Sequence, residues 1–294
     1  MLDVSETVAM GELRRLVDSA GPNEVAFTDP AFPGRPLILH SARPRHYAPT
    51  TPILFVQHGR SRNGRDYRDY LIPLVDEHDL LVIAPEFSNE SFPGQAWYNS
   101  GNVLDEAKRL NPAPSRSYAI IEHLFAALQA QGVTERKGYG LFGHSAGSQF
   151  VHRMVMFGHR RHVVSAVAAN AGTYMMPDLS VEFPYGLRAT GMGEGDLEAL
   201  LGFRLTVMAG TADNDPDEPF FPKDPGSMRQ GATRYERAHR FVEAGRDMAR
   251  RLGMHCAWTI IDVPGVAHDG RQMAIAAAPI LAAALHASEP ARTA

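Results

Sequence analysis

KGYGLFGHSAGSQF, residues 137–150, is the stretch that decides the fold of this chain. Its centre, Gly143-His144-Ser145-Ala146-Gly147, has the pattern G-x-S-x-G, with a short apolar run before it and a helix-like run, residues 149–157, after it. A strand, a sharp turn and a helix in this order are the context of a nucleophile elbow. The turn is so tight that we expect strained backbone at the serine. Only glycine should fit two residues before and two residues after it.

An elbow of this kind lifts the hydroxyl of Ser145 above the end of a sheet. The backbone amide of Ala146 then lies at a helix N-terminus and points to the place where a negatively charged oxygen would form. We therefore predict that Ser145 is a nucleophile and that Ala146 is one donor of an oxyanion hole. His144 is expected to support the turn and is also a candidate to contact substrate. The alternative is a glycine- and serine-rich turn that has this pattern by chance.

The composition fits a large globular domain. A chain of 294 residues with 44% apolar residues can bury the core of one large α/β domain or of two small ones. The even spacing of its strand-like runs favours a single domain over residues 1–294. The net charge is −4 with both signs interspersed, so we expect no nucleic acid partner. No apolar run approaches the length of a membrane span, so no membrane partner is expected, and a homo-oligomer is compatible with the sequence.

The N-terminal residues and the cysteine content indicate the compartment. The N-terminus is acidic and lacks a basic region followed by an apolar core, so no secretory signal is visible. Cys256 is the only cysteine, which excludes intramolecular disulfides. We therefore expect a cytoplasmic protein, although a secreted protein whose signal had been removed has the same appearance.

Strand-like and helix-like patterns alternate along the chain. An amphipathic helix is predicted within residues 1–20, ended by Gly21-Pro22, and an antiparallel pair of short strands follows at residues 24–28 and 35–40. Continuous apolar runs predict strands buried on both faces at residues 53–57, 80–84 and 163–169, and further strands are predicted at residues 205–209 and 257–263. Helices are predicted at residues 67–78, 115–131, 149–157, 232–252 and 271–285. This alternation implies an α/β fold with a mostly parallel central sheet and helices on both faces.

Three segments lack a clear period. Residues 85–114 follow a buried strand, and residues 171–202 and 214–231 are predicted as irregular insertions near the active site rather than as a lid domain. Aromatic and methionine side chains in the first two segments are candidates to line an apolar acyl pocket, although each alone fits ordinary packing: Trp97, Tyr98, Met175, Met176, Phe183 and Tyr185.

A nucleophilic serine needs a base, usually histidine, which a carboxylate orients. Folds built around such an elbow present the three groups in the chain order serine, acid, histidine, each at the carboxyl end of a strand. Asp213 and His268 fall where this order requires, after the strands predicted at 205–209 and 257–263. Asp215 stands further from the strand end, so Asp213 is preferred.

The acidic residues that follow Asp213 allow a second interpretation. A calcium loop also contains several carboxylates, but residues 213–218 lack the ligand spacing and the glycine of an EF-hand. A polar surface turn is the simpler interpretation. We therefore predict no metal site and no cofactor.

The second oxyanion donor should follow the first long buried strand, where His58-Gly59-Arg60 occurs. Gly59 lets the backbone approach the site, and the amide of Arg60 is the predicted donor. The guanidinium of Arg60, with those of Arg62 and Arg65, can also recognise a substrate carboxylate. The simpler alternative is that these arginines pair with nearby acids or face solvent.

Together these motifs resemble the polyhydroxybutyrate depolymerase and feruloyl-esterase-like group of α/β-hydrolases, from Arg35 onward. The resemblance is carried by His58-Gly59, Trp97-Tyr98-Asn99, the elbow glycines and serine, Gly210-Thr211-Ala212-Asp213, and Pro264-Gly265 before His268. It implies an α/β-hydrolase fold and carboxylic-ester hydrolysis through an acyl-enzyme, without metal or organic cofactor. Secreted depolymerases of this group resemble signal-bearing, disulfide-containing proteins with a polymer-binding domain, and none of these features is visible. A soluble ester or oligomer is therefore expected as substrate rather than solid polymer.

The prediction is a serine hydrolase that acts on a small-molecule ester. Ser145 would attack the ester carbonyl while His268, oriented by Asp213, takes its proton, and the amides of Ala146 and Arg60 would hold the oxyanion. One alternative is a hydrolase of small amides or peptides with the same three residues. Another is a non-catalytic binding protein on a hydrolase scaffold.

Overall fold

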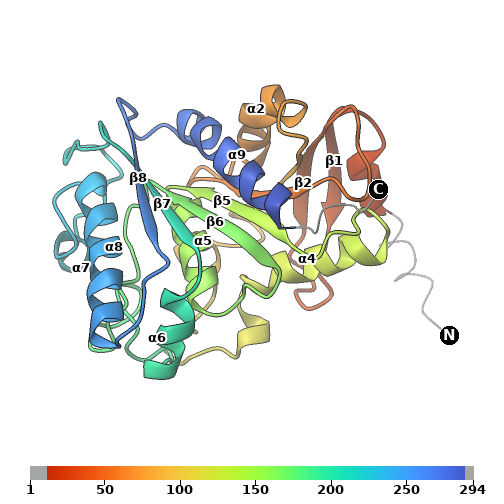
Figure 1. Ribbon diagram of the computed structural model, residues 1–294. Helices are drawn as coiled ribbons and strands as arrows, with labels where there is room; N and C mark the ends of the chain where they lie inside the picture. The colour runs from red at the N-terminus through yellow and green to blue at the C-terminus, as the bar shows by residue number, and fades with distance from the viewer. Residues whose placement is uncertain (1–11, 289–294) are drawn as a thin grey trace.

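The computed structural model describes residues 12–288 (Figure 1). These residues form one eight-stranded sheet with the order β1-β2-β4-β3-β5-β6-β7-β8. The strands are β1 (Gly21–Phe27), β2 (Leu37–Arg43), β3 (Ile53–Gln57), β4 (Leu81–Glu86), β5 (Tyr139–His144), β6 (Val163–Ala169), β7 (Leu205–Gly210) and β8 (Thr259–Val263). β2 pairs antiparallel with β1 and with β4, and every other neighbouring pair is parallel. The predicted antiparallel opening pair and mostly parallel sheet are confirmed.

Helices cover both faces of the sheet, as the alternating pattern predicts. They are α2 (Gly64–Val75), α3 (Gly94–Trp97), α4 (Ala119–Ala130), α5 (Ala146–Met156), α6 (Glu194–Leu201), α7 (Pro225–Met228), α8 (Arg234–Arg251) and α9 (Gly270–Ala287). α2 and α9 pack on one face, and α4, α5 and α8 pack on the other (Figure 1). Two 3₁₀ helices, η1 (Glu12–Val17) and η2 (Ala113–Ser115), precede β1 and α4. Among the described residues, no helix combines the length and the apolar character needed to cross a membrane.

The strand β3 shows why the central strands have continuous apolar sequences. All five of its residues are buried, and its side chains alternate between two cores. Phe55 lies in the core beneath α4 and α5, whereas Leu54 and Val56 lie in the core beneath α2 and α9. A strand covered on both faces has no solvent side that would favour polar residues.

The N-terminal region differs from the prediction. Residues 1–11 of the predicted helix lie outside the described residues, and Glu12–Val17 form a 3₁₀ helix. Leu13 and Leu16, three residues apart, are both buried, which suits the threefold repeat of a 3₁₀ helix. Gly21 does not end a helix. It opens β1 with φ at 83°, a left-handed conformation that glycine tolerates.

The start of the helix predicted at residues 115–131 also differs. Ser115 does not cap it, because this residue ends the separate turn η2, and α4 begins four residues later at Ala119. Pro112 precedes this turn and Pro114 lies within it. Arg116, directly after the turn, has extended backbone with φ −84° and ψ 133°, so η2 and α4 are separate elements.

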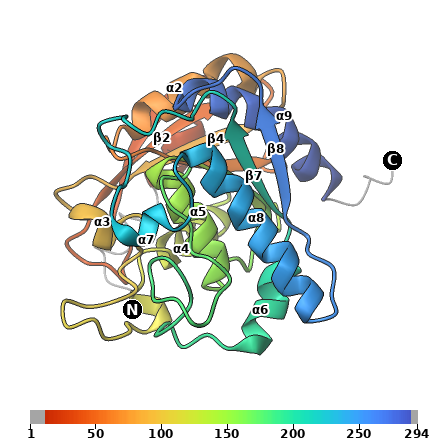
Figure 2. The same cartoon turned by 90° about the vertical axis from the view of Figure 1, so that its left-hand side faces the viewer.

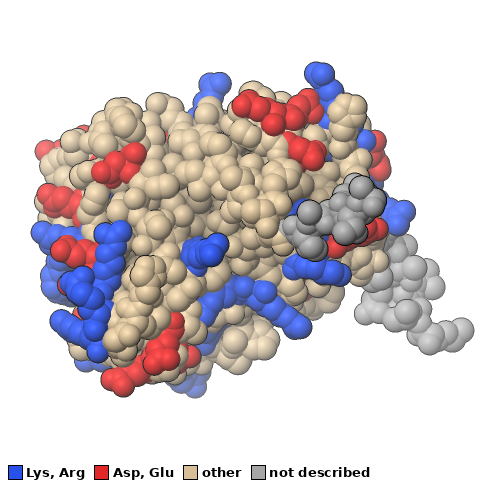
Figure 3. Space-filling view, viewed as in Figure 1, with Lys and Arg blue, Asp and Glu red and all other residues tan. Residues whose placement is uncertain are grey.

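The irregular segments lie at the carboxyl ends of the parallel strands. Residues 171–202 contain α6 and residues 214–231 contain α7, and both segments are irregular outside these helices. Figure 2 shows α3 and α7, which follow β4 and β7, on the same side of the molecule. On the face drawn in Figure 3, basic and acidic side chains are interspersed, with basic groups gathered over α8.

Candidate active site

The elbow predicted from G-x-S-x-G forms between β5 and α5. Ser145 has φ 56° and ψ −116°, a strained conformation for a residue with a side chain. A Cβ atom at Gly143 would lie 2.2 Å from the carbonyl oxygen of Gly147, and one at Gly147 would lie 2.1 Å from the carbonyl oxygen of Gln57. Close backbone approach therefore requires glycine at both positions, and the expected strain is present.

Three polar side chains from different strand ends meet at this turn. Nε2 of His268 lies 3.0 Å from Oγ of Ser145, and Nδ1 of His268 lies 2.8 Å from Oδ2 of Asp213. An ionised carboxylate only accepts hydrogen bonds, so Nδ1 carries the proton of the neutral imidazole and donates it to Asp213. Nε2 is then free to accept the hydrogen of the serine hydroxyl. The arrangement can move a proton from the serine oxygen to the imidazole.

A buried ion pair holds Asp213 in place. Its side chain is 4% exposed, and its Oδ1 lies 3.3 Å from Nη1 of Arg234, the first residue of α8. Arg234 is buried as well and also bonds the carboxylate of Glu218. Asp215 and Asp217 are exposed, so they do not share this environment. Within residues 12–288 no three acidic, histidine or cysteine side chains are grouped as a metal site of these residues needs.

His144 lies behind the site rather than in the wall of the cleft above it. Its ring centroid is 4.7 Å from that of His268, and its Nδ1 is 2.8 Å from the hydroxyl of Tyr67 in α2. Burial, followed by the charges of His268 and Arg234, holds the pKa of His144 well below its usual range, so the ring is neutral. His144 is therefore positioned to support the ring of His268.

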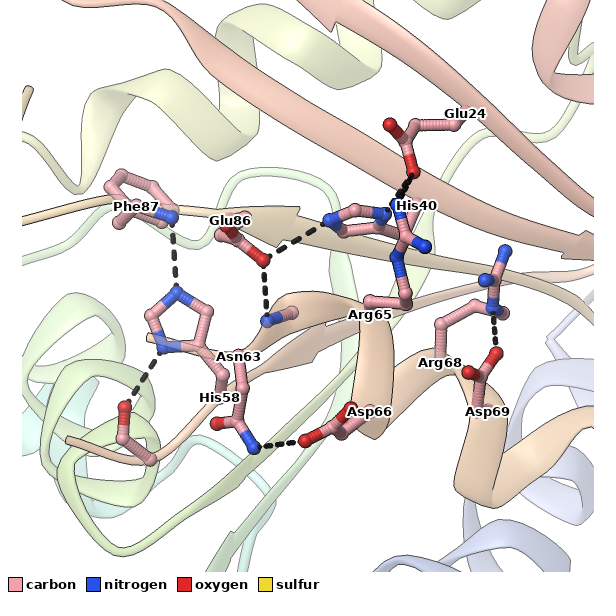
Figure 4. A network of polar contacts seen from close by, with 12 residues as sticks. Glu24, His40, His58, Asn63, Arg65, Asp66, Arg68, Asp69, Glu86 and Phe87 are labelled. Carbon is pink, nitrogen blue, oxygen red and sulfur yellow. Dashed lines mark hydrogen bonds and ion pairs between the residues drawn. The ribbon is translucent and has the colours of Figure 1, made fainter. Parts of the chain in front are cut away.

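His58 fixes the loop that carries Arg60 (Figure 4). Its Nδ1 lies 2.9 Å from the carbonyl oxygen of Gly59, and its Nε2 accepts the backbone N–H of Phe87 at 3.0 Å. Nδ1 must carry the proton, because a carbonyl oxygen only accepts. Burial lowers the pKa of His58 to about 3, so the ring remains neutral at neutral pH. This one side chain ties the loop after β3 to the loop after β4.

Two backbone amides are free to donate beside Ser145. Ala146 is the first residue of α5, so its N–H has no acceptor within the helix. Arg60 follows Gly59, whose Cβ position would lie 3.9 Å from Cβ of Ser145. The N–H of Arg60 bonds no other residue in the described part of the chain. Both residues predicted as oxyanion donors therefore line the cleft beside the serine.

The cleft above Ser145 has a volume of about 310 Å³ and a polar wall. Four amide side chains and three guanidinium groups contribute to this wall: Asn89, Gln95, Asn99, Gln149, Arg60, Arg62 and Arg234. Its lining residues also include Tyr98, Phe220 and Pro222, which present aromatic and aliphatic surface.

Of the six candidates for an apolar acyl pocket, the cleft contains only Tyr98. The other five lie elsewhere, one stacked against the guanidinium of Arg35 and four in or against the core or beside α8: Trp97, Met175, Met176, Phe183 and Tyr185. The sequence shows which residues of an irregular segment are apolar. It does not show which way the segment turns.

Arg62 and Arg65 have partners that define their roles. Arg62 donates to the carbonyl oxygens of Phe87 at 2.6 Å and of Gly94 at 2.7 Å. It therefore joins the loop after β3 to the loop after β4 in the wall of the cleft. Arg65 does not line the cleft and pairs with Glu24 at 2.8 Å.

The sequence pattern does not mark Arg234 and Tyr67, which hold Asp213 and His144. Arg234 begins a helix that contains five further arginines, so nothing local distinguishes it. Tyr67 lies on the buried face of α2, where an aromatic residue is ordinary core. Only the three-dimensional contacts identify these two residues.

The sheet order and the strained serine at the end of β5 place the chain among the hydrolases of the α/β-hydrolase fold. Two solved structures are similar over nearly the whole chain. The LpqC poly(3-hydroxybutyrate) depolymerase from Bordetella parapertussis is 35% identical with a TM-score of 0.89, over 97% of this chain and 96% of its own. Poly(aspartic acid) hydrolase-1 from Sphingomonas sp. KT-1 is 37% identical with a TM-score of 0.86, over 90% of this chain and 99% of its own. The chain belongs to the α/β-hydrolase esterase family that these two proteins represent.

A more distant similarity concerns the fold alone. The IroE-like serine hydrolase from Shewanella oneidensis is 13% identical with a TM-score of 0.56, over 89% of this chain and 78% of its own. No protein-family model and no curated protein sequence matches the chain. The family assignment therefore rests on the two close structural relatives.

Proposed function

We propose that this protein hydrolyses carboxylic esters through an acyl-enzyme, with Ser145 as the nucleophile. The supporting observation is the continuous hydrogen-bonded path from Oγ of Ser145 through His268 to Asp213. A serine hydroxyl is a weak nucleophile at neutral pH, and an adjacent oriented imidazole removes its proton during the attack.

The geometry supports a two-step reaction. In the first step Oγ of Ser145 attacks the ester carbonyl carbon while Nε2 of His268 takes the hydroxyl proton, and the amides of Ala146 and Arg60 stabilise the oxyanion. When the tetrahedral intermediate collapses, the carbon–oxygen bond to the alcohol breaks and His268 protonates that alcohol. In the second step His268 takes a proton from water, which attacks the acyl carbon. The bond from that carbon to Oγ of Ser145 then breaks, His268 returns the proton to Oγ, and the acid is released. Asp213 holds the imidazole in the required tautomer throughout.

The proposed substrate is a short-chain ester or a soluble hydroxyalkanoate oligomer. One close relative is named a poly(3-hydroxybutyrate) depolymerase, and the units of that polymer are short hydroxyacids joined by esters. The cleft of about 310 Å³ with its polar wall also favours a short acyl group over a long aliphatic chain.

The test is hydrolysis of 4-nitrophenyl esters from acetate to long acyl chains by the wild type and by Ser145→Ala. We expect turnover that peaks at short chains and is lost in the variant, and a fluorophosphonate probe should label the wild type at Ser145 alone. Ser148→Ala, three residues further along α5, is the matched control and should retain most of the activity. A folded wild type that cleaves no ester and is not labelled would contradict the proposal.

Amide hydrolysis is a second candidate. The other close relative is named a poly(aspartic acid) hydrolase, and the units of such a polymer are joined by amides. An acyl-enzyme forms from an amide by the same steps, but the poorer leaving group demands stronger protonation by His268. Comparing a 4-nitrophenyl ester with the 4-nitroanilide of the same acid would decide between the two, because an amidase turns over both and an esterase only the first.

A further inference from the structure

Arg60 brings a cation into the cleft without an anionic partner. Its guanidinium lies 3.5 Å from the centre of the Phe220 ring. Within residues 12–288 its side chain forms no ion pair and no hydrogen bond. Arg60 comes from the loop after β3 and Phe220 from the segment after β7, and both line the cleft over Ser145. The stacked pair therefore joins two walls of the site.

Two other exposed arginines have carboxylate partners. Arg65, five residues further on, pairs with Glu24 at 2.8 Å, and Arg109 pairs with Asp105 at 2.8 Å. The alternative considered from the sequence, that the arginines after β3 simply pair with nearby acids, therefore holds for Arg65 and not for Arg60. Its position in the cleft is the feature that sets Arg60 apart.

The positive charge of the cleft is not balanced by its own wall. The lining residues include three arginines and no aspartate or glutamate. Arg234 is neutralised by Asp213 and Glu218 beneath the surface, whereas the described residues give Arg60 and Arg62 no such partner. A cleft lined by one sign of charge concentrates ligands of the opposite sign.

We propose that the substrate is an ester that also carries a free carboxylate, and that the guanidinium of Arg60 binds this carboxylate. The proposal rests on ester hydrolysis at Ser145 and specifies the substrate class. A guanidinium presents its N–H groups in a planar fork that matches a carboxylate. Stacking on Phe220 uses the face of the guanidinium, so the N–H edges stay available and the side chain loses less freedom on binding.

The place of Arg60 limits where the carboxylate can lie. The backbone amide of the same residue is a proposed oxyanion donor, so its side chain reaches only groups a few bonds from the ester carbonyl. Such a carboxylate occurs on the acyl side in a half-ester of a short diacid, and on the alcohol side in a short hydroxyacid oligomer. Both substrates present the same chemistry to Arg60.

Two matched pairs of esters test the proposal. In the first pair, 4-nitrophenyl hydrogen glutarate is compared with its methyl ester, which places the charge on the acyl side. In the second pair, 4-acetoxybenzoate is compared with its methyl ester, which places the charge on the alcohol side. The measured quantity is the ratio of kcat/KM for the charged ester to kcat/KM for the neutral ester, since this ratio cancels effects on the shared chemical steps.

We expect Arg60→Gln to lower this ratio by about 10-fold to 100-fold in at least one pair, mainly through KM, because a hydrogen bond to a charged group is lost. Arg60→Lys keeps the charge without the fork and should give an intermediate ratio. Arg65→Gln, an exposed arginine outside the cleft, should leave the ratio unchanged. Raising the salt concentration should lower the ratio of the wild type and not that of Arg60→Gln.

Failure of this proposal is distinguishable from failure of the proposed function. Wild-type enzyme that cleaves the neutral esters through Ser145, with ratios unchanged by Arg60→Gln in both pairs, would overturn carboxylate binding and leave ester hydrolysis intact. Wild-type enzyme that cleaves none of the four esters would overturn both.

Discussion

Two regions meet at Ser145, and they are held by different kinds of contact. The elbow is held by backbone atoms, because Gly143 and Gly147 approach neighbouring carbonyl groups too closely for any side chain. The segment between β7 and α8, residues 211–233, is held by side chains from α8. Arg234 bonds two of its carboxylates, and Arg237 donates to the carbonyl oxygens of Pro222 and Gly231 within it.

Because of this difference, a local sequence motif marks the elbow, whereas no such motif marks the segment between β7 and α8. A close backbone approach requires glycine at fixed spacing, so the elbow is visible in the sequence. A side chain that reaches across the fold can come from many positions. The contacts of Arg234 and Arg237 are therefore not visible in the sequence. Changes in either region should affect stability, and each region holds one group of the proposed chemistry, Ser145 in the elbow and Asp213 in the segment.

Asp213→Asn should have the largest effect, a loss of kcat of about 10³-fold to 10⁴-fold. The amide of asparagine can donate to Nδ1 of His268, which favours the tautomer that cannot accept the serine proton. Turnover of 4-nitrophenyl acetate measures the loss. Asp215→Asn, two residues away and exposed, is the control and should retain wild-type activity. Equal losses in the two variants would show that the acid is assigned wrongly.

Arg234→Gln should lower the free energy of unfolding by about 3–5 kcal/mol, because it leaves the buried carboxylate of Asp213 without its cation. Urea denaturation measures this change, and kcat should fall with it as the acid moves. Arg240→Gln removes an exposed arginine from the same helix and should change the free energy of unfolding by less than about 0.5 kcal/mol. If Arg234→Gln is as stable as this control, side chains do not hold the segment.

Gly147→Ala should destabilise the fold by about 3 kcal/mol and abolish turnover, because the new methyl group meets the backbone carbonyl of Gln57. Thermal denaturation and ester hydrolysis give the two readouts. Gly195→Ala in α6 has open space around the new atom and should be neutral or stabilising. A stable and active Gly147→Ala variant would show that close backbone contacts do not hold the elbow.

His58, in the loop after β3, makes the free energy of unfolding depend on pH. Its pKa is about 3 in the fold and about 6.5 in the unfolded chain, so below pH 6.5 only the unfolded chain gains a proton and stability falls. Between pH 7 and pH 5 this group should account for a loss of about 2 kcal/mol.

The measurement is urea denaturation at both pH values for the wild type and His58→Gln. The variant should be less stable at pH 7 but should lose about 2 kcal/mol less than the wild type on going to pH 5. His46→Gln, at an exposed histidine, should keep the wild-type dependence. Identical losses for wild type and His58→Gln would contradict a buried neutral imidazole.

Sequence patterns predict the sheet and its helices because buried strands and amphipathic helices have different hydrophobic periods. The positions of Asp213 and His268 could be predicted as well, since the strands before them are recognisable and the order of the three groups is fixed by the fold. The prediction of an amphipathic helix at the N-terminus was wrong within residues 12–20. The three-residue spacing of the apolar Leu13 and Leu16 fits a 3₁₀ helix equally well.

The wall of the cleft could not be predicted. The acyl-pocket candidates were chosen because they are apolar, but all except Tyr98 lie outside the cleft. The direction of an irregular segment depends on contacts made far along the chain, such as Trp97 with Arg35. Arg60 was considered for two roles, and the sequence could not show that its guanidinium would stack on Phe220 rather than meet an acid.

The contact between Gly147 and Gln57 has a consequence for refolding. Gln57 ends β3 and Gly147 lies in the first turn of α5, so the strained turn at Ser145 exists only after β3 has docked beside β5. A collapsed intermediate with native helix content but an unpaired centre of the sheet has no working nucleophile. Recovery of catalysis should therefore lag behind recovery of the helical circular dichroism signal. Turnover then reports the fraction of molecules in which β3 has paired with β5.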